Sequence, residues 1–407
     1  MTPSRRRSYV SASKPQTTGE RNRQRGNCRS QSWLRLPILQ CAGTSIAFWV
    51  AYLPCPNMML RNRSDEPTAR AEQGEPNAAQ PAPEGHRVPL AIRASIALLG
   101  GSWGAFITYF SLIVAPSHLA KDFSWPWRAA RVLIEGHNPY DVIRATGPYP
   151  FNVGLFYPLP AVIAALPFAT LRPEIAGACF FGLSSGLLAF GLTRTRSDLS
   201  KLPVFVSAPF CMAGVLVQWA PLMTATAALP ALQFLAVCKP NIGLACWTYR
   251  PTVRGAVAAA AFAALTLLIV PSWPLDWRDA LQAAPRYKGP LFRGVTGLLL
   301  LVGAIAWRRR EGRIFLAMSV VPQLSLFYDQ LPLWLIPQTI WRSVLLSALS
   351  WVAWWQWYPS RALTSSVAVA APWVFWLIYM PTLAILILPL GALRRRQSPV
   401  ASEVSGD

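Results

Sequence analysis

The polar segment from 120 to 150 contains the residues of this chain that are best suited to chemistry. It lies between an apolar run that ends near Val114 and another that begins at Val153. A segment in that position is expected at one mouth of a membrane-embedded domain. Three of the few carboxylates in the apolar part of the chain fall inside it: Asp122, Glu135 and Asp141.

Asp122 is the candidate general base. It stands a few residues past the end of an apolar run, where partial desolvation and neighbouring cations tune the pKa of a carboxylate. The alternative is a structural role, in which Asp122 caps the next helix by accepting from the backbone amides of Ser124 or Trp125. The sequence leaves both interpretations open.

A short amphipathic helix is predicted over 127–135, because Pro126 suits a first helical turn and Gly136 suits a helix end. Arg128, Arg131 and Glu135 would share its polar face. Such a helix lies along a membrane interface, either beside a binding site or as a connector.

Polar residues inside apolar runs form the second group of candidates. Asp329, Lys239 and, more weakly, Gln218 are flanked by apolar sequence, and an ionisable residue at membrane depth is a functional hypothesis by default. Asp276 and Asp279 remain further candidates. Asp198 and Glu311 lie in arginine-rich stretches and are expected to form surface ion pairs, and Glu174 suits a first helical turn.

The elements that must position these residues are predicted to be membrane helices. Apolar residues make up 53% of the chain and charged residues 14%, whereas soluble domains carry about 25% charged residues. Continuous apolar runs predict an all-α, polytopic integral membrane protein with about nine to eleven transmembrane helices. These runs are near 89–115, 153–171, 175–193, 203–219, 222–238, 253–271, 295–307, 314–327, 331–357 (expected as two short helices) and 366–390.

The formal charge of +21 does not indicate a nucleic-acid partner, because arginines gather at the ends of apolar runs. That placement follows the positive-inside rule and puts 194–201, 308–313 and 394–396 in the cytoplasm. A helix beginning at Pro89 then delivers Asp122 to the opposite side. Two full spans between 150 and 194 would break the rule, so either 153–171 does not cross completely or one exception exists.

Cysteine and carboxylate spacing gives no sign of a metal or cofactor. The seven cysteines form no Cys-x-x-Cys pair, and we interpret them as packing residues. An Asp-x-Asp pair, which would hold a nucleotide sugar through a divalent ion, is also missing from the sequence.

Three regions are predicted along the chain. Residues 1–86 are expected to be a disordered or weakly constrained extension with a possible apolar segment at 37–60. Residues 87–393 form the membrane-embedded domain, and 394–407 form a short cytoplasmic tail.

The motifs in residues 89 to 390 resemble those of glycosyltransferase family 87. An acid after the first helix is followed by x-x-Trp-x-Ala-Ala-x-x-Leu-x-x-Gly-x-Asn-Pro-Tyr-Asp over 125–141 and by Tyr149-Pro150. The later motifs that resemble the family are Gln218-Trp219-Ala220-Pro221-Leu222, Lys239-Pro240-Asn241 and Tyr328-Asp329-Gln330. Two departures are Val217, where a glycine usually precedes the glutamine, and the short interval from Gln218 to Lys239.

The resemblance implies a membrane enzyme of the C-type glycosyltransferase superfamily in the plasma (inner) membrane, with an extracytoplasmic active site. It would transfer mannose or a related hexose from a polyprenyl-phosphate sugar to a glycolipid or polysaccharide acceptor, with inversion and without a cofactor. Asp122 would be the base. The expected substrate-binding residues are Arg128, Arg131, His137, Asn138, Tyr140, Tyr149, Gln218, Lys239 and Asp329, and Arg286 and Lys288 are chosen by charge alone for the donor phosphate.

Two other classes of function fit parts of the sequence. A transporter or flippase also uses prolines and buried charges in apolar helices, although the chain shows no convincing two-half repeat. A non-catalytic membrane scaffold would tolerate the loss of Asp122 or Lys239.

Overall fold

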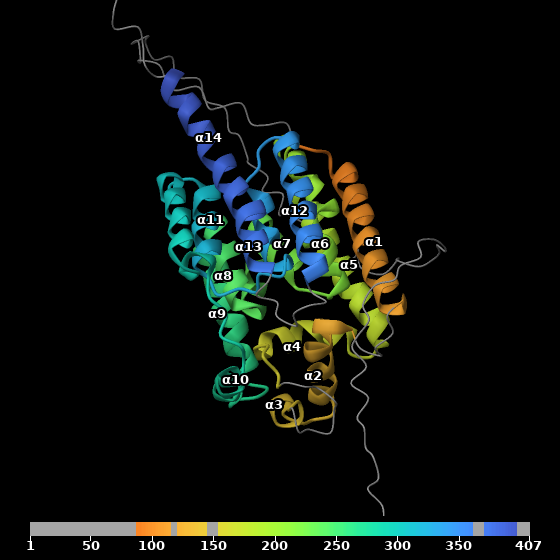
Figure 1. The fold of residues 1–407 in the computed structure, drawn as a ribbon. Helices are drawn as coiled ribbons and strands as arrows, with labels where there is room; N and C mark the ends of the chain where they lie inside the picture. The colour runs from red at the N-terminus through yellow and green to blue at the C-terminus, as the bar shows by residue number, and fades with distance from the viewer. Residues whose placement is uncertain (1–86, 115–119, 145–153, 361–369, 397–407) are drawn as a thin grey trace, which may run out of the picture. The chain divides into compact units, whose positions relative to one another are not determined.

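In a computed structural model of the protein, the residues described are 87–114, 120–144, 154–360 and 370–396 (Figure 1). These residues belong to one compact unit within 62–407. The predictions for 1–86, for 397–407 and for Tyr149 fall outside the described residues. Within the described ranges the secondary structure is helical, apart from one isolated bridge between Arg87 and Thr195.

The described helices follow one another without a strand between them, so the all-α prediction is confirmed for these residues. In chain order they are α1 (Leu90–Val114), η1 (Lys121–Phe123), α2 (Ser124–Ile134), α3 (Pro139–Val142), α4 (Leu159–Ala165), η2 (Leu166–Phe168), α5 (Pro173–Leu192), η3 (Arg196–Val206), α6 (Ala208–Val215), α7 (Ala220–Ala228), η4 (Pro230–Cys238), α8 (Pro240–Tyr249), α9 (Val253–Thr266), α10 (Trp273–Gln282), η5 (Pro290–Phe292), η6 (Val295–Ala306), α11 (Arg310–Val320), η7 (Tyr328–Leu335), α12 (Ile340–Ser360), α13 (Ala371–Val374), η9 (Phe375–Tyr379) and α14 (Met380–Arg396).

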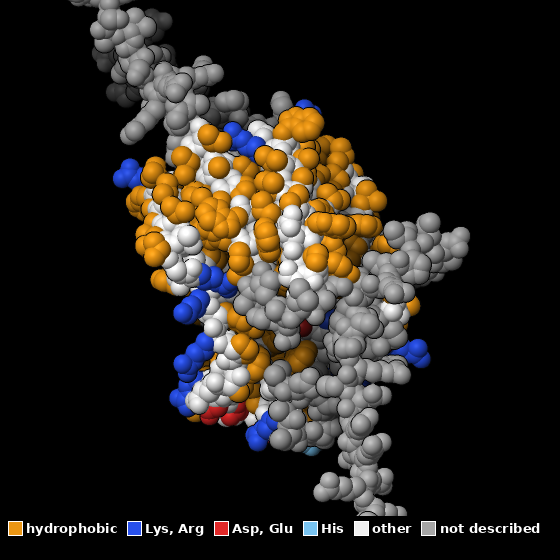
Figure 2. Space-filling view, viewed as in Figure 1, with side chains coloured by type: hydrophobic (Ala, Val, Ile, Leu, Met, Phe, Trp, Pro, Cys, Tyr) orange, Lys and Arg blue, Asp and Glu red, His pale blue; other side chains and the backbone are white. Residues whose placement is uncertain are grey.

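Three described helices are long and apolar enough to cross a membrane: Leu90–Val114, Pro173–Leu192 and Ala371–Leu388. Shorter apolar helices accompany them at Leu159–Phe168, Val253–Thr266 and Val295–Ala306. Figure 2 shows hydrophobic side chains covering the part of the visible face over α1, α11 and α12. A membrane protein is therefore indicated, while the number of nine to eleven spans stays a prediction.

Prolines divide several apolar runs that the sequence suggested as single spans. The run at 203–219 becomes the end of η3 followed by α6, and the run at 222–238 becomes α7 followed by η4. Proline cannot donate a backbone hydrogen bond and clashes inside a helix, so new helices begin at these residues. The run at 331–357 does split as expected, although its second helix, α12, is 21 residues long.

Helices α1 and α5 form an antiparallel pair through glycines. A Cβ atom built at Gly182 would lie 2.9 Å from Ala105 Cβ and 3.0 Å from the Gly101 carbonyl oxygen. Only glycine lets the two backbones approach this closely, as at small-residue interfaces of membrane helices. At the far end of the pair, the Arg93 guanidinium donates to the Phe190 carbonyl oxygen at 3.1 Å.

The lengths of the described helices bear on the choice between a partial crossing at 153–171 and one exception to the positive-inside rule. Between the polar segment and α5, α4 and η2 together span only Leu159–Phe168, ten residues, or about 15 Å if fully helical. That is half the thickness of the hydrocarbon layer. The segment 153–171 therefore does not provide a full helical crossing, and α5 returns the chain to Arg194, beside the start of α1.

The described part of the polar segment, 120–144, lies at the end of α1 where that helix finishes (Figure 1). Helices α2, α3, α4 and α10 meet there. Trp127 Nε1 donates to the Phe168 carbonyl oxygen at 3.1 Å, and Trp277 Nε1 donates to that of Phe156 at 2.9 Å. The predicted amphipathic helix is confirmed as α2, which ends before Gly136 at a φ of 81° and buries Ala129 and Val132.

Candidate functional site

Four side chains from distant parts of the sequence form one hydrogen-bonded chain, which we call the Asp122 cluster: Asp122, Gln218, Lys239 and Asp329. Gln218 Nε2 donates to Asp122 Oδ2. Lys239 Nζ donates to Gln218 Oε1 at 3.2 Å and to Asp329 Oδ1 at 2.6 Å. The four residues that the sequence drew from four separate motifs therefore lie together.

Short helices meet end to end around the Asp122 cluster. Asp122 lies in η1 and Asp329 in η7, whereas Gln218 precedes α7 and Lys239 precedes α8. The Asp122 amide donates to the Leu216 carbonyl oxygen at 3.2 Å, which ties η1 to the residues that follow α6. Gln218 and Lys239 therefore stand at breaks between helices and not inside a continuous helix.

The backbone at the cluster is strained. Three non-glycine residues in the described ranges have positive φ angles: Lys121 at 49°, Val217 at 51° and Phe327 at 68°. Lys121 and Val217 immediately precede members of the cluster, and Phe327 comes two residues before Asp329. Such conformations cost about 1–2 kcal/mol for an L-residue and concentrate at functional sites.

Val217, which stands where the family-87 motif usually has glycine, adopts a backbone conformation that glycine favours. The motif usually has glycine before the glutamine, and glycine adopts positive φ without penalty. Val217 adopts φ 51° and is fully buried, so the glycine-type backbone is retained with a β-branched residue.

Burial raises the pKa of Asp122 to about 6, and Asp329 adds to the rise, while Lys239 and the hydrogen bond from Gln218 oppose it. Asp122 is partly buried. Among the described residues, Gln218 donates to Asp122 Oδ2 and none donates to Oδ1. With a pKa of about 6 the carboxylate is deprotonated for the most part at pH 7, which is one requirement of a general base.

Lys239 and Asp329 form the anchored end of the cluster. The side chain of Asp329 is 4% exposed and that of Lys239 is 15% exposed. Asp329 Oδ2 also accepts from the Leu324 amide at 3.0 Å, and Lys239 lies 5.2 Å from the centre of the Tyr328 ring. A buried pair with these additional contacts is held in one geometry and fixes the orientation of the Gln218 amide.

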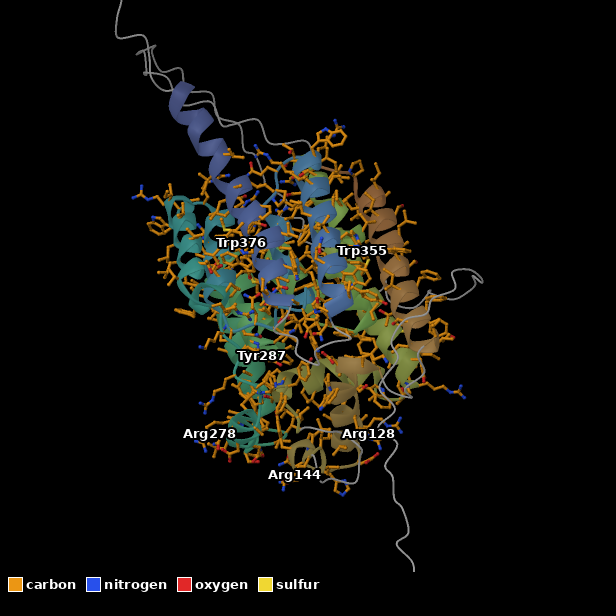
Figure 3. All side chains as sticks on the ribbon, viewed as in Figure 1. Arg128, Arg144, Arg278, Tyr287, Trp355 and Trp376 are labelled. Carbon is orange, nitrogen blue, oxygen red and sulfur yellow. The ribbon has the colours of Figure 1, made fainter. Side chains whose placement is uncertain are left out.

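Tyrosines that the sequence did not select surround the cluster. Burial and the charges of Asp122 and Asp329 raise the pKa of Tyr157 well above its usual value. The same three causes, in the order burial, Asp329 and Asp122, raise the pKa of Tyr287 (Figure 3). Both phenols stay protonated and are available as donors. Nothing in an apolar or loop sequence distinguishes such tyrosines from packing residues.

Two other residues predicted to bind substrate, Asn138 and Tyr140, form hydrogen bonds within the protein. The Asn138 side chain caps α3 by accepting from the Tyr140 amide at 3.1 Å, and its Nδ2 donates to Asp276 Oδ2 at 3.0 Å. The Tyr140 hydroxyl donates to the Tyr157 carbonyl oxygen at 2.8 Å. These bonds build the polar layer beneath the cluster, and a direct substrate contact by either residue stays a prediction.

Apart from Lys239, the cations chosen from the sequence are not members of the Asp122 cluster. Arg128 and Arg131 are half-buried on α2, where Arg131 stacks 5.2 Å from the centre of the Trp127 ring. His137 is exposed, and Arg286 and Lys288 are exposed on either side of Tyr287. The cation nearest to Asp122 in sequence is Lys121, whose pKa burial lowers to about 8; we had not selected it.

The remaining candidate acids are not members of the Asp122 cluster; they are exposed or bond to other residues. Glu135 and Asp141 are exposed, and Asp141 pairs with Arg144, as exposed Asp279 pairs with Arg278. Asp276 accepts from Asn138 and from Ser272. Among the described carboxylates, Asp329 is the one that the structure brings into the cluster with Asp122.

Of the two interpretations of Asp122, the capping role is not observed, because the N-cap of α2 is Phe123 without a side-chain bond and the Asp122 carboxylate accepts from Gln218. Asp198 and Glu311 form ion pairs with neighbouring cations, as expected. Their expected surface location was wrong, because they are buried, at 7% and 4% exposure. Hydropathy at arginine-rich ends does not indicate such burial.

Within 87–114, 120–144, 154–360 and 370–396, no group of three or more His, Cys, Asp or Glu side chains is placed to hold a metal ion.

No family model matches the chain, and no curated protein or solved structure is significantly similar to it. The resemblance to glycosyltransferase family 87 therefore rests on the motifs themselves, and the function that it implies is argued from the site.

Proposed function

We propose that the protein is a membrane-bound glycosyltransferase that uses a polyprenyl-phosphate sugar, in which mannose is the expected hexose. The observation that carries the proposal is the Asp122 cluster, because one open carboxylate is held by a chain of three other polar groups. A pKa of about 6 suits a base that works near neutral pH. The acceptor is a glycolipid or polysaccharide hydroxyl.

In the proposed reaction, Asp122 Oδ1 accepts the proton of the acceptor hydroxyl. The acceptor oxygen forms a bond to the anomeric carbon from the face opposite the phosphate, so the configuration inverts. The bond from that carbon to the phosphate oxygen breaks, and polyprenyl phosphate leaves with the bonding electrons. Asp122 then releases its proton to water.

The other cluster residues have positioning roles in this proposal. Gln218 holds Asp122 Oδ2, so that Oδ1 faces the acceptor, and Lys239 holds Gln218 Oε1. Asp329 satisfies the charge of Lys239 in its buried position. Lys239 is therefore assigned to orienting Gln218 and not to the donor phosphate, for which Lys121 is the better-placed cation.

The arrangement of the ends of the helix pair supports the proposed side of the membrane. Arg93 and Arg194 lie at one end of α1 and α5, whereas Asp122 follows the other end of α1. Positively charged ends favour the cytoplasm. We accordingly assign the protein to the plasma (inner) membrane as a multi-pass protein with an extracytoplasmic active site.

The test is incubation of the purified full-length protein with radiolabelled polyprenyl-phosphate mannose and an envelope lipid extract. The expected result is label in a more polar glycolipid, with release of polyprenyl phosphate. A donor that stays unchanged across a broad panel of acceptors would contradict transferase activity. Movement of intact labelled donor across vesicles without any product would favour the alternative, a transporter or flippase.

A further inference from the structure

Three arginines line one cavity at the end of the fold that lies away from Asp122. The cavity has a volume of ≈390 Å³ and is bounded by the start of α1, the end of α5 and the α7–η4 turn. Its lining residues are Arg87, Val88, Leu90, Arg93, Arg194, Ala228, Leu229 and Pro230. This volume lies within the range of small-molecule sites, which is about 300–1,000 Å³.

Arg93 is fixed in place and retains unused donor capacity. Its guanidinium stacks 3.9 Å from the centre of the Phe190 ring and donates through Nη2 to the Phe190 carbonyl oxygen at 3.1 Å. Its buried Nε has no partner. A guanidinium held by stacking is preorganised to bind an oxyanion in a planar, bidentate geometry.

The other two arginines are brought to the cavity by the backbone. Arg87 forms an isolated bridge with Thr195, and the Val88 amide donates to the Arg194 carbonyl oxygen at 3.4 Å. The side chains of Arg87 and Arg194 are exposed, and neither makes an ion pair with a described residue. Three positive charges therefore share one cavity and lack a protein counter-ion among the described residues.

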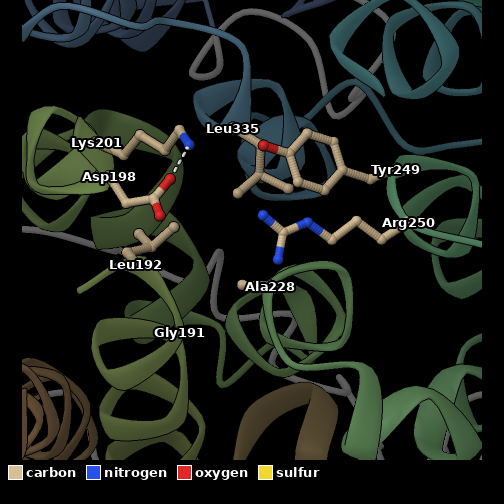
Figure 4. A pocket seen from close by; sticks show the side chains of 8 residues that line it. All are labelled: Gly191, Leu192, Asp198, Lys201, Ala228, Tyr249, Arg250 and Leu335. Atoms are coloured by element: carbon tan, nitrogen blue, oxygen red, sulfur yellow. Dashed lines mark hydrogen bonds and ion pairs between the residues drawn. The ribbon is translucent and has the colours of Figure 1, made fainter. Parts of the chain in front are cut away.

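A neighbouring acid already has protein partners. Asp198 lines a smaller, water-sized cavity of ≈10 Å³ (Figure 4), and Ala228 lines both this cavity and the arginine cavity. Asp198 accepts from Lys201 at 2.7 Å and from Thr195 at 2.6 Å. No described acidic residue lines the arginine cavity, so its three positive charges suit an anionic ligand.

The apolar part of the lining indicates which kind of anion fits. Leu90 is 68% exposed, and Leu98 and Leu99 farther along α1 are 60% and 71% exposed. An amphiphile with a charged head at the arginines could lay its chains along the exposed apolar surface of α1, whereas a soluble ion would gain nothing from it. Arginine is also the residue that best matches phosphate geometry.

We propose that Arg87, Arg93 and Arg194 bind the phosphoryl headgroup of an anionic phospholipid. The site is separate from the proposed sugar transfer, because it lies at the start of α1, and the 25 residues of that helix span about 37 Å before the polar segment begins. It does not depend on the proposed enzymatic function.

The test measures thermal unfolding of the purified full-length protein in detergent against added short-chain lipid. Dihexanoyl phosphatidic acid should raise the Tm in a saturable way, because a ligand that binds only the folded state stabilises it. Arg194→Gln, at an exposed position, should weaken the apparent Kd about tenfold, and Arg93→Gln with Arg194→Gln should weaken it further. Arg196→Gln is the matched control, since Arg196 is exposed nearby but does not line the cavity.

Each contrary result is informative. An equal loss of affinity in Arg196→Gln would mean that general surface charge attracts the lipid, which overturns the three-arginine site. Equal stabilisation by inorganic phosphate at the same concentration would overturn the lipid as its source. Absence of saturable stabilisation of the unsubstituted protein by phosphatidic acid would overturn the proposal altogether.

Discussion

Asp122 lies in an environment that disfavours its charged form. Its Oδ2 accepts from Gln218, and its Oδ1 accepts from no described residue. Burial raises its pKa to about 6, and the raised pKa is moderated by Lys239 and Gln218. A base must be deprotonated to work, so the proposed transferase activity should rise as the pH increases through about 6 and level off above it. Besides burial, Lys239, Gln218 and Asp329 determine the pH at which the activity rises, because each of them shifts the pKa of Asp122.

Removal of the Gln218 amide should move the pH dependence. The hydrogen bond from Gln218 favours the charged form of Asp122, so Gln218→Ala should raise the pKa of Asp122 further. We expect the acid limb of the kcat/KM profile to shift to higher pH by about 0.5–1 unit. Gln282→Ala, at an exposed amide on α10, is the control and should leave the profile unchanged; an identical profile for Gln218→Ala would contradict the positioning role.

The Lys239–Asp329 pair should show strong coupling in a double-mutant cycle. Lys239→Met or Asp329→Leu alone leaves one buried charge without its partner and should cost about 3–5 kcal/mol of unfolding free energy. The double variant should be far more stable than the sum of the two losses predicts.

The exposed pair of Arg144 and Asp141 provides the comparison for this cycle. Its side chains are 59% and 62% exposed, and such pairs couple by about 0.5 kcal/mol or less. Additive losses at Lys239 and Asp329 would show that the two charges do not stabilise one another. Unfolding in detergent, followed by circular dichroism, gives both cycles.

At the residue scale, the sequence was informative where polarity contrasts with its surroundings. Gln218, Lys239 and Asp329 stand out because their neighbours are apolar, and their assembly with Asp122 was suggested only by the order of the motifs. Tyr157 and Tyr287 gave no such contrast. Asn138 could have been predicted as a helix cap, because asparagine before a proline at the first helical position is a favoured N-cap. In the structure it caps α3.

At the element scale, the close contact between α1 and α5 determines where Asp122 and Arg194 lie. Gly182→Leu should destabilise the protein by more than about 2 kcal/mol, because a side chain there meets Ala105 and the Gly101 backbone. Leu183→Ala, on the neighbouring outward-facing position, is the control and should cost less than about 1 kcal/mol. Similar thermal stability of the two variants would contradict the glycine interface.

The sequence predicted apolar segments well and their internal breaks poorly. Hydropathy averages over a window, so a run such as 222–238 scores as one span although Pro230 ends α7 and begins η4. Proline signals were present at each break, but membrane helices also tolerate proline. Packing between helices decides which outcome occurs, and a single sequence does not contain that information.

At the scale of the whole described unit, the two polar ends should face opposite sides of the membrane. In a chain whose seven cysteines are replaced, Arg196→Cys and Asp141→Cys each introduce one exposed thiol. A membrane-impermeant maleimide should label position 196 only from the cytoplasmic side and position 141 only from the other side. Labelling of both positions from one side would contradict the orientation.

The substitution Asp122→Asn tests the central claim most directly, because it keeps the size of the side chain and an oxygen that accepts from Gln218. Transfer from radiolabelled polyprenyl-phosphate mannose should fall by about 10²–10⁴-fold, while donor binding changes little. Glu135→Gln, at an exposed acid of the same polar segment, should transfer at the unsubstituted rate. Unchanged transfer by Asp122→Asn would contradict the account, and so would equal losses in the two variants.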